Sequence, residues 1–189
     1  MKKNVLMIVI IMVASGMILW ILSARKASPL PTQSPTVSSL AKAMEISSSA
    51  FENNTPIPKQ YTCDGSDVNP KISISHVPSA AKSLALILTD ADVQGGDFVH
   101  WFVWNIPPTT TEINEGTIPS GAVVGKNDLG KKGYSGPCPP SGSHSYIFTL
   151  YGLDDTLKLG SEAPKIDVEK TIAGHNVSAA SLVGTYSRR

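Results

Sequence analysis

The stretch KSLALILTDADVQGGDFVHWFVWNI, residues 82–106, decides the fold class, because two apolar runs of strand length flank a polar loop. The runs are Lys82 to Thr89 and Phe98 to Ile106, and a Pro-Pro pair ends the second. A third run, SYIFTLYGL, occupies residues 145–153. Apolar runs of this length bounded by Gly and Pro are typical of strands buried in a sheet or sandwich core.

Weaker patterns complete a β-rich domain. Short strands are predicted around Phe51, at Lys71 to Ser75 and at Ala122 to Gly125, with a terminal strand at Ser178 to Thr185. Helix is predicted only for about a turn at Glu169 to Ala173. The 15 Gly and 14 Pro favour short strands joined by defined turns. We therefore predict a mainly β, mostly antiparallel domain whose long loops carry any chemistry.

Residues 1–26 have the pattern of an N-terminal signal anchor. Val5 to Leu22 carry no charge, Lys2 and Lys3 precede them, and Arg25 and Lys26 follow. Eighteen residues at about 1.5 Å each give roughly 27 Å of helix, close to a hydrocarbon core of about 30 Å. We expect a single-pass membrane protein with an extracytoplasmic domain. The alternative is a cleaved signal peptide and a secreted protein, although cleavage after Ala24 would place Leu22 where a small residue is usual.

Residues 27–43 are rich in Ser, Thr, Pro and Ala and read as a solvated tether, which leaves residues 44–189 as one domain. The 16 Lys and Arg against 15 Asp and Glu give a net charge of +1. A charge balance this even excludes nucleic-acid binding by bulk electrostatics, so any partner must be recognised locally. Cys63 and Cys138 both fall in loop-like sequence, where an exported domain could pair them as a disulfide or bury them as free thiols.

Polar residues at the strand ends form a candidate binding site. Asp90 and Asp92 follow the first apolar run, and His100 lies in the second. If the two strands are neighbours, the Asp90 carboxylate can hold one ring nitrogen of His100 and leave the other for a ligand. The alternative is that the two aspartates cap a turn.

A second histidine follows the loop GYSGPCPPSGSHSY, residues 133–146. Its glycines allow close backbone approach, and Pro137, Pro139 and Pro140 restrict the loop before a ligand arrives. His144 could then project over a preorganised pocket, unless the loop is merely rigid. No Gly-x-Ser-x-Gly, HExxH or CxxC motif occurs, so we predict no catalytic residue, metal or cofactor.

Four ordered stretches then indicate a family: Tyr61 to Pro70, Thr89 to Pro107, Asn127 to Asp154 and Gly174 to Arg188. From about Ile46 onwards the chain resembles the phosphatidylethanolamine-binding protein family, specifically its bacterial and archaeal Raf-kinase-inhibitor-like branch. The resemblance implies an antiparallel β sandwich of two sheets with few helices. It also implies a small anion pocket that accepts phosphate-like groups, including phospholipid headgroups, with no defined catalytic reaction.

The resemblance assigns ligand-binding positions to the family's motifs. These are Asp90 and Asp92 for its Asp-Pro-Asp-Ala-Pro motif, His100 for its pocket histidine, His144 and Tyr146 for its Gly-x-His-Arg-Tyr segment, and Pro139 and Pro140 for its loop prolines. Both prolines of the first motif are absent here, which implies a less rigid loop. The usual Arg is Ser145, which removes a fixed cation.

The resulting expectation is a membrane-tethered, extracytoplasmic, non-catalytic protein that binds a small anion such as phosphate, a carboxylate or a lipid headgroup. One alternative is an inhibitor or scaffold of a partner enzyme, either a protease or a kinase. Another is a weak hydrolase that activates water with His and Asp.

Overall fold

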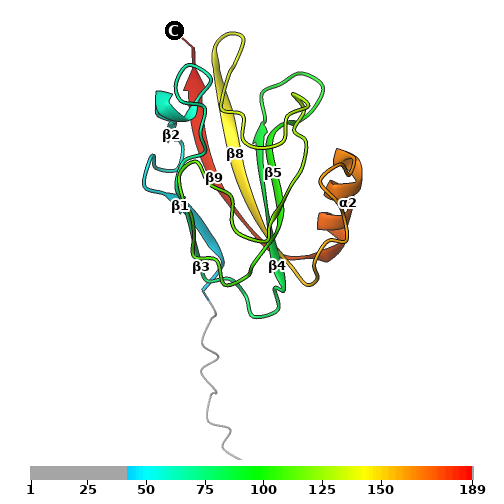
Figure 1. The fold of residues 1–189 in the computed structure, drawn as a ribbon. Helices are drawn as coiled ribbons and strands as arrows, with labels where there is room; N and C mark the ends of the chain where they lie inside the picture. The colour runs from blue at the N-terminus through cyan, green and yellow to red at the C-terminus, as the bar shows by residue number, and fades with distance from the viewer. Residues whose placement is uncertain (1–41, 189) are drawn as a thin grey trace, which may run out of the picture. The chain divides into compact units, whose positions relative to one another are not determined.

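The computed structural model describes residues 42–188 and shows two β sheets with one α-helix outside them (Figure 1). In chain order the elements are β1 (Glu45–Ser48), β2 (Thr55–Pro56), the 3-10 helix η1 (Lys59–Tyr61), β3 (Ile72–Ser75), β4 (Ser83–Asp90), β5 (Phe98–Ile106), β6 (Glu112–Ile113), β7 (Val123–Val124), β8 (Ser143–Leu153), α2 (Lys165–His175) and β9 (Asn176–Ser187).

The small sheet has the strand order β1-β3-β6, and the large sheet has the order β2-β9-β8-β4-β5-β7. All strand pairs are antiparallel except β2 with β9. The main apolar core includes Ile72 and Ile74 of the small sheet and Leu86 of the large one. The prediction of a mainly β, mostly antiparallel protein with few helices is therefore confirmed.

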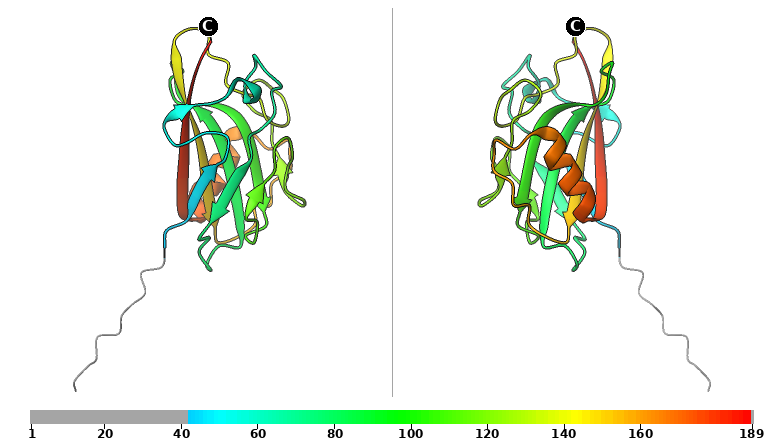
Figure 2. Two further views of the ribbon diagram at one scale, coloured as in Figure 1. Left: turned by 90° about the vertical axis from the view of Figure 1, so that its left-hand side faces the viewer. Right: turned by 90° about the vertical axis from the view of Figure 1, so that its right-hand side faces the viewer.

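The continuous apolar runs are explained by burial on both faces of the large sheet. Leu84, Leu86 and Leu88 of β4 point into the main core, whereas Ala85 and Ile87 point to the opposite face. Helix α2 covers part of that opposite face, as Figure 2 shows. A strand enclosed on both sides has no reason to alternate apolar with polar residues, so the runs lack a two-residue period.

The short strands β1, β2 and β6 were not predicted, and two other segments differ from the sequence prediction. Helix α2 is longer than the expected turn because Val168 and Ile172, four residues apart, both bury against the large sheet. Phe51 is not in a strand. It lies in the loop after β1 and is buried in the core, with its ring centroid 5.9 Å from that of Phe148. The sequence prediction therefore took a buried apolar residue of a loop for part of a strand.

Cys63 and Cys138 form a disulfide with a Cα–Cα distance of 5.5 Å, which confirms the paired alternative over free thiols. The bond joins the segment after η1 to the loop that precedes β8. The predicted anchor, residues 1–26, and nearly all of the predicted tether lie outside the described residues. Within residues 42–188, no helix has the length and apolarity needed to cross a membrane.

Candidate functional site

Three strands of the large sheet bring the predicted site residues to one end of the molecule. Asp90, the last residue of β4, pairs with Phe98 at the start of β5 and with Tyr146 near the start of β8. The polar loop after β4 and the Gly- and Pro-rich loop before β8 therefore meet, although they are far apart in the sequence. Figure 1 shows these loops at the same end of the sheet.

A cavity of about 440 Å³ lies between these loops. It is lined by Asp90, Asp92, Val93, Gln94, Phe98, His100, Leu129, Cys138, Pro140 and His144. Five of the seven predicted ligand-binding residues are in this lining, and the other two, Pro139 and Tyr146, are buried outside it. Phe98 could have been anticipated, because it precedes His100 by two residues in a strand. Leu129 could not, because its loop shows no pattern.

Asp90 holds His144 and not His100, which corrects the predicted partner. The Nδ1 atom of His144 donates to Oδ2 of Asp90 at 2.7 Å, and the aspartate side chain is only 4% exposed. The other carboxylate oxygen accepts the backbone N–H of Asp92 at 3.0 Å. Asp90 therefore serves both as a turn-capping residue and as the partner of a cavity histidine.

His100 lies at an irregularity in the β4–β5 pairing. Leu88 pairs with Trp101 and Thr89 pairs with Val99, so His100 is the extra residue of a β-bulge. A bulge changes the direction of a side chain relative to a regular ladder. The strand pattern alone gave no sign of this irregularity.

The imidazole of His100 is fixed by the loop before β8. Its Nδ1 lies 2.9 Å from the carbonyl oxygen of Ser135, and the backbone N–H of Ser135 donates in return to the His100 carbonyl at 3.1 Å. Asn127 donates from Nδ2 to that same His100 carbonyl and to Oγ of Ser135. Burial lowers the pKa of His100, partly opposed by the Ser135 carbonyl and the Asp90 carboxylate. Asn127 is thus a buried supporting residue whose role the sequence did not indicate.

Tyr146 lies behind the cavity and contacts both histidine rings. Its ring centroid is 5.3 Å from that of His100, edge to face, and 6.5 Å from that of His144. The hydroxyl is fully buried and has no hydrogen-bond partner among residues 42–188. Burial, followed by the nearby Asp90 carboxylate, raises the pKa of this phenol well above its usual value. Tyr146 therefore acts as a neutral wall that sets the spacing of the two imidazoles.

Asp92 fastens the loop after β4 to the start of β8. Its Oδ2 accepts the backbone N–H of Ser145 at 2.6 Å, and this hydrogen bond lowers the pKa of the Asp92 carboxyl group. Ser145 occupies the position where the family resemblance would place an Arg. The loop is consequently held by a backbone contact and not by an arginine side chain.

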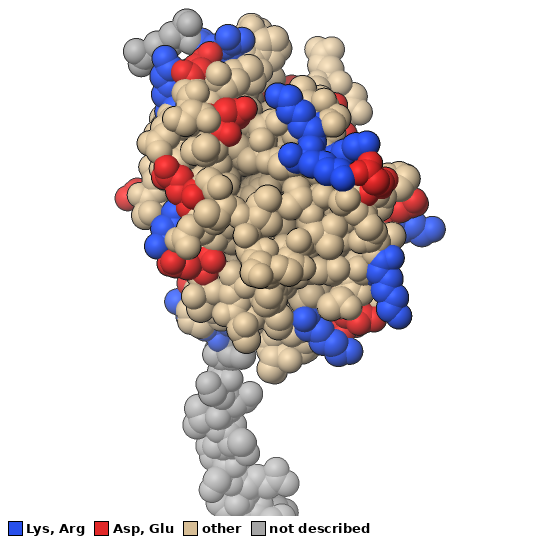
Figure 3. Space-filling model, viewed as in Figure 1, with Lys and Arg blue, Asp and Glu red and all other residues tan. Residues whose placement is uncertain are grey.

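The lining contains no Lys or Arg. Lys126 and Lys132 flank the turn that carries Leu129, but both form ion pairs with Glu162, and these contacts lower the pKa of Glu162 to about 2. Figure 3 shows cationic and acidic side chains near one another on both sides of this face. Within residues 42–188, no three His, Cys, Asp or Glu side chains are grouped as a metal site requires. Positive charge within the lining can therefore come only from the imidazoles.

Comparison with known proteins identifies the family of this fold. The family model described as "Phosphatidylethanolamine-binding protein" matches residues 47–187. The chain belongs to the phosphatidylethanolamine-binding protein family. A UPF0098 protein from Methanothermobacter thermautotrophicus is 45% identical over 150 residues, which cover 77% of this chain and 99% of that relative. A second UPF0098 protein, from Pyrococcus horikoshii, is also 45% identical and matches 75% of this chain and 76% of its own length.

Two solved structures support the same phosphatidylethanolamine-binding protein fold. A crystal structure from Chlamydia trachomatis, described as a homologue of this family, has a TM-score of 0.74 and 39% identity, covering 78% of this chain and 99% of that one. The structure of Escherichia coli YbcL, described as a member of the mammalian family, has the same TM-score with 26% identity and covers 78% of this chain and all of its own.

Proposed function

We propose that this phosphatidylethanolamine-binding protein family member binds a small phosphate-like anion without converting it chemically. The observation that carries the proposal is that His100 and His144, which belong to different strands, line one cavity and contact the same Tyr146 ring. Imidazoles are the cationic groups available in the lining. An anion between them would exchange hydration for directed hydrogen bonds in a partly enclosed site.

His144 supplies the principal contact in this proposal. Its Nδ1 is committed to Asp90, so the ring orientation is set and Nε2 is left for a ligand. In the protonated ring, Nε2–H donates to an anionic oxygen. A hydrogen bond to a charged group contributes about 1.5 to 3 kcal/mol.

The shape of the cavity suits an anion that carries an organic group. Its volume of about 440 Å³ lies within the range of roughly 300 to 1,000 Å³ that small-molecule sites occupy. Phe98, Val93 and Leu129 provide apolar walls beside the polar end. A phosphate group could therefore sit at the histidines while an attached carbon chain lies against these side chains.

Isothermal titration calorimetry of the full-length chain with inorganic phosphate tests the proposal. His144→Ala should weaken binding about tenfold or more, because it removes the charged donor. His175→Ala is the matched control, because His175 also binds an aspartate, Asp154, but lies on the surface outside the cavity. Unchanged phosphate affinity in His144→Ala would exclude the proposed role.

One observation favours a second candidate, a weak hydrolase. The His144–Asp90 pair has the arrangement of a general base and the residue that orients it. The test is phosphate release from a panel of phosphate monoesters, with Asp90→Asn as the inactive control. Because the pair lacks an identified nucleophile, we expect no release. Turnover that disappears in Asp90→Asn would favour the hydrolase.

We also propose that the N-terminal segment holds the domain at a membrane, with the domain on the extracytoplasmic side. The support is the uncharged run from Val5 to Leu22 between basic flanks. Membrane fractionation of the full-length chain, compared with a chain that starts at Lys42, tests this. Recovery of the full-length chain in the soluble fraction would contradict it.

A further inference from the structure

The two sides of the cavity are held in place very differently. The loop before β8 is tied to the rest of the domain by the disulfide between Cys63 and Cys138. The backbone N–H of Gly136 in the same loop also donates to Oδ1 of Asp67 at 2.6 Å. The other side of the cavity is formed by the loop between β4 and β5, residues 91–97, which Figure 1 shows on the side of α2.

The loop between β4 and β5 is fastened near its two ends. At one end, Oδ2 of Asp92 accepts the backbone N–H of Ser145 at 2.6 Å. At the other end, Nζ of Lys165 in α2 donates to the carbonyl oxygen of Asp97 at 2.8 Å. Residues 93–96 lie between these contacts and form no hydrogen bond within the described part of the chain. These four residues are the wall segment of the cavity.

The wall segment borders two separate hollows. Val93 and Gln94 line the cavity of about 440 Å³, and they also line a second hollow of about 570 Å³. Lys165 and Glu169 of α2 belong to the lining of this second hollow. Val93 is half-buried but packs against neither apolar core, and Gln94 is exposed. Movement of the wall segment therefore breaks no hydrogen bond and leaves no gap in a core.

Two glycines give the wall segment a backbone that can change direction. Gly95 has a φ of +100° and Gly96 has a φ of +126°, a region that other residues rarely adopt. A Cβ at either position would meet nothing within 4 Å, so no neighbouring atom confines the backbone there. Segments with few buried contacts and no hydrogen bonds open at a low free energy. The wall segment is thus free to move between its two fixed ends.

We propose that the wall segment closes on the organic group of a bound phosphate ester. The phosphate stays at His144, and Val93 moves onto the carbon atoms attached to it, so that these atoms are enclosed together with Phe98 and Leu129 of the same lining. The inference rests on the proposed function. It makes the wall segment the element that distinguishes a phosphate ester from inorganic phosphate.

The ligand dependence of the closure follows from the apolar character of Val93. Ordering four mobile residues costs conformational entropy, which a contact has to offset. An organic group supplies apolar surface that Val93 can bury, and burial of apolar surface is favourable. Inorganic phosphate offers no such surface, so the wall segment should remain mobile when inorganic phosphate is bound.

Electron paramagnetic resonance of a spin label on the full-length chain tests the movement. Both cysteines of the sequence are in the disulfide, so Gln94→Cys adds a single thiol for labelling. Ser143→Cys, at the exposed first residue of β8, is the matched control. Without ligand, the label at position 94 should move faster than the label at position 143. Phenyl phosphate should slow the label at position 94, inorganic phosphate should not, and neither should affect the control.

Calorimetry with the same two ligands measures the contact made by Val93. Val93→Ala removes two methyl groups and should weaken the binding of phenyl phosphate about threefold or more, with a smaller effect on inorganic phosphate. Val177→Ala is the matched control, because Val177 is a valine of β9 that is 43% exposed and lies outside the cavity lining. It should change neither affinity.

The outcomes separate the two proposals. Equal mobility of the labels at positions 94 and 143 without ligand would overturn the movable wall. A label at position 94 that keeps its mobility when phenyl phosphate binds, or that inorganic phosphate slows equally, would overturn the closure on the organic group. Each of these results leaves anion binding standing. Failure of both ligands to bind in calorimetry would instead overturn the proposed function, and the closure with it.

Discussion

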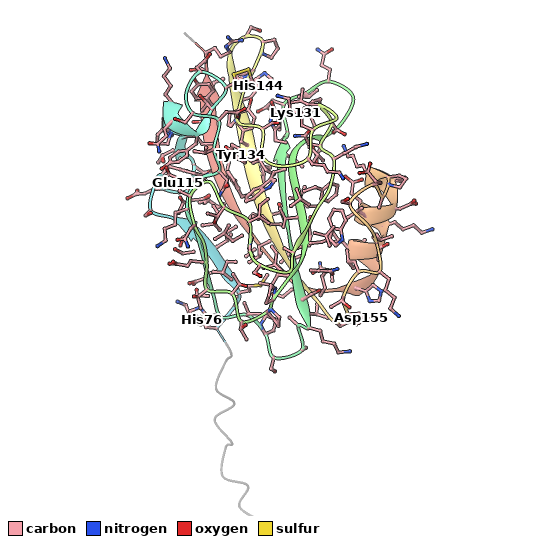
Figure 4. All side chains as sticks on the ribbon, viewed as in Figure 1. His76, Glu115, Lys131, Tyr134, His144 and Asp155 are labelled. Carbon is pink, nitrogen blue, oxygen red and sulfur yellow. A yellow bond between two sulfur atoms is a disulfide. The ribbon has the colours of Figure 1, made fainter. Side chains whose placement is uncertain are left out.

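Nδ1 of His144 donates to Oδ2 of Asp90 at 2.7 Å, across 54 residues of sequence, in a site where the aspartate side chain is 4% exposed. The chain contains a second pair of the same chemistry, His175 with Asp154 at 2.8 Å, where the aspartate is 53% exposed. Figure 4 shows His144 at one end of the domain and His76 and Asp155 at the other. The buried pair lines the cavity and the exposed pair does not, so the second serves as an internal control for the first.

Asp90→Asn should lower the free energy of unfolding by about 1 to 3 kcal/mol, because an amide has one acceptor oxygen where Asp90 now accepts from two N–H groups. Asp154→Asn should cost less than about 1 kcal/mol, since exposed charge pairs contribute little. Urea denaturation of both variants measures the difference. An equal decrease in the free energy of unfolding of the two variants would show that burial of the His144–Asp90 pair does not increase its contribution to stability.

Replacement of both cysteines by serine should destabilise the domain by about 4 kcal/mol in the chain-entropy treatment, because the disulfide closes a span of 75 residues. Phosphate affinity should also fall, since Cys138 is part of the cavity lining. Thermal unfolding with and without reductant measures the stability. Wild type should lose stability on reduction and the double variant should not, and a reductant-sensitive double variant would contradict this explanation.

Gly136→Ala should cost about 1 to 3 kcal/mol, because a new Cβ would collide with backbone atoms that cannot move aside. It would meet the carbonyl oxygen of Tyr61 and lie 2.7 Å from Cα of Thr62. Gly160→Ala is the control, because nothing lies within 4 Å of its Cβ position. Chemical denaturation compares the two. If they are equally stable, the close packing of the loop before β8 is not required for folding.

The stability of the domain should fall as the pH decreases from about 7.5 to 5.5, in part through His100. Burial lowers the pKa of His100 in the folded protein below its ordinary value of 6.5. The unfolded chain then binds this proton more readily, so His100 favours the folded state above pH 6.5 and opposes it as the solution becomes more acidic. Urea denaturation at both pH values should show a smaller decrease for His100→Phe than for wild type. An equal decrease would mean that His100 is not the group responsible.

The strands could be predicted because their cause is local. The run from Phe98 to Ile106 coincides with β5, and Lys82 to Thr89 overlaps almost all of β4, since central strands need apolar residues on both faces. Asp90, His100 and His144 could be singled out because they are polar residues adjoining or interrupting such runs, and the structure places all three in the lining of one cavity. The disulfide was foreseen as one of two alternatives.

The partnerships among those residues depended on contacts between distant segments. A β-bulge places His100 against Ser135, and the pairing of β4 with β8 places Asp90 beside His144, so the carboxylate serves a different histidine from the one expected. The amino-acid composition of a strand indicates whether the strand is buried, and this composition can be read directly from the sequence. Register and bulges are set by how the strands pack together, so which nitrogen faces which oxygen emerges only in the folded sheet.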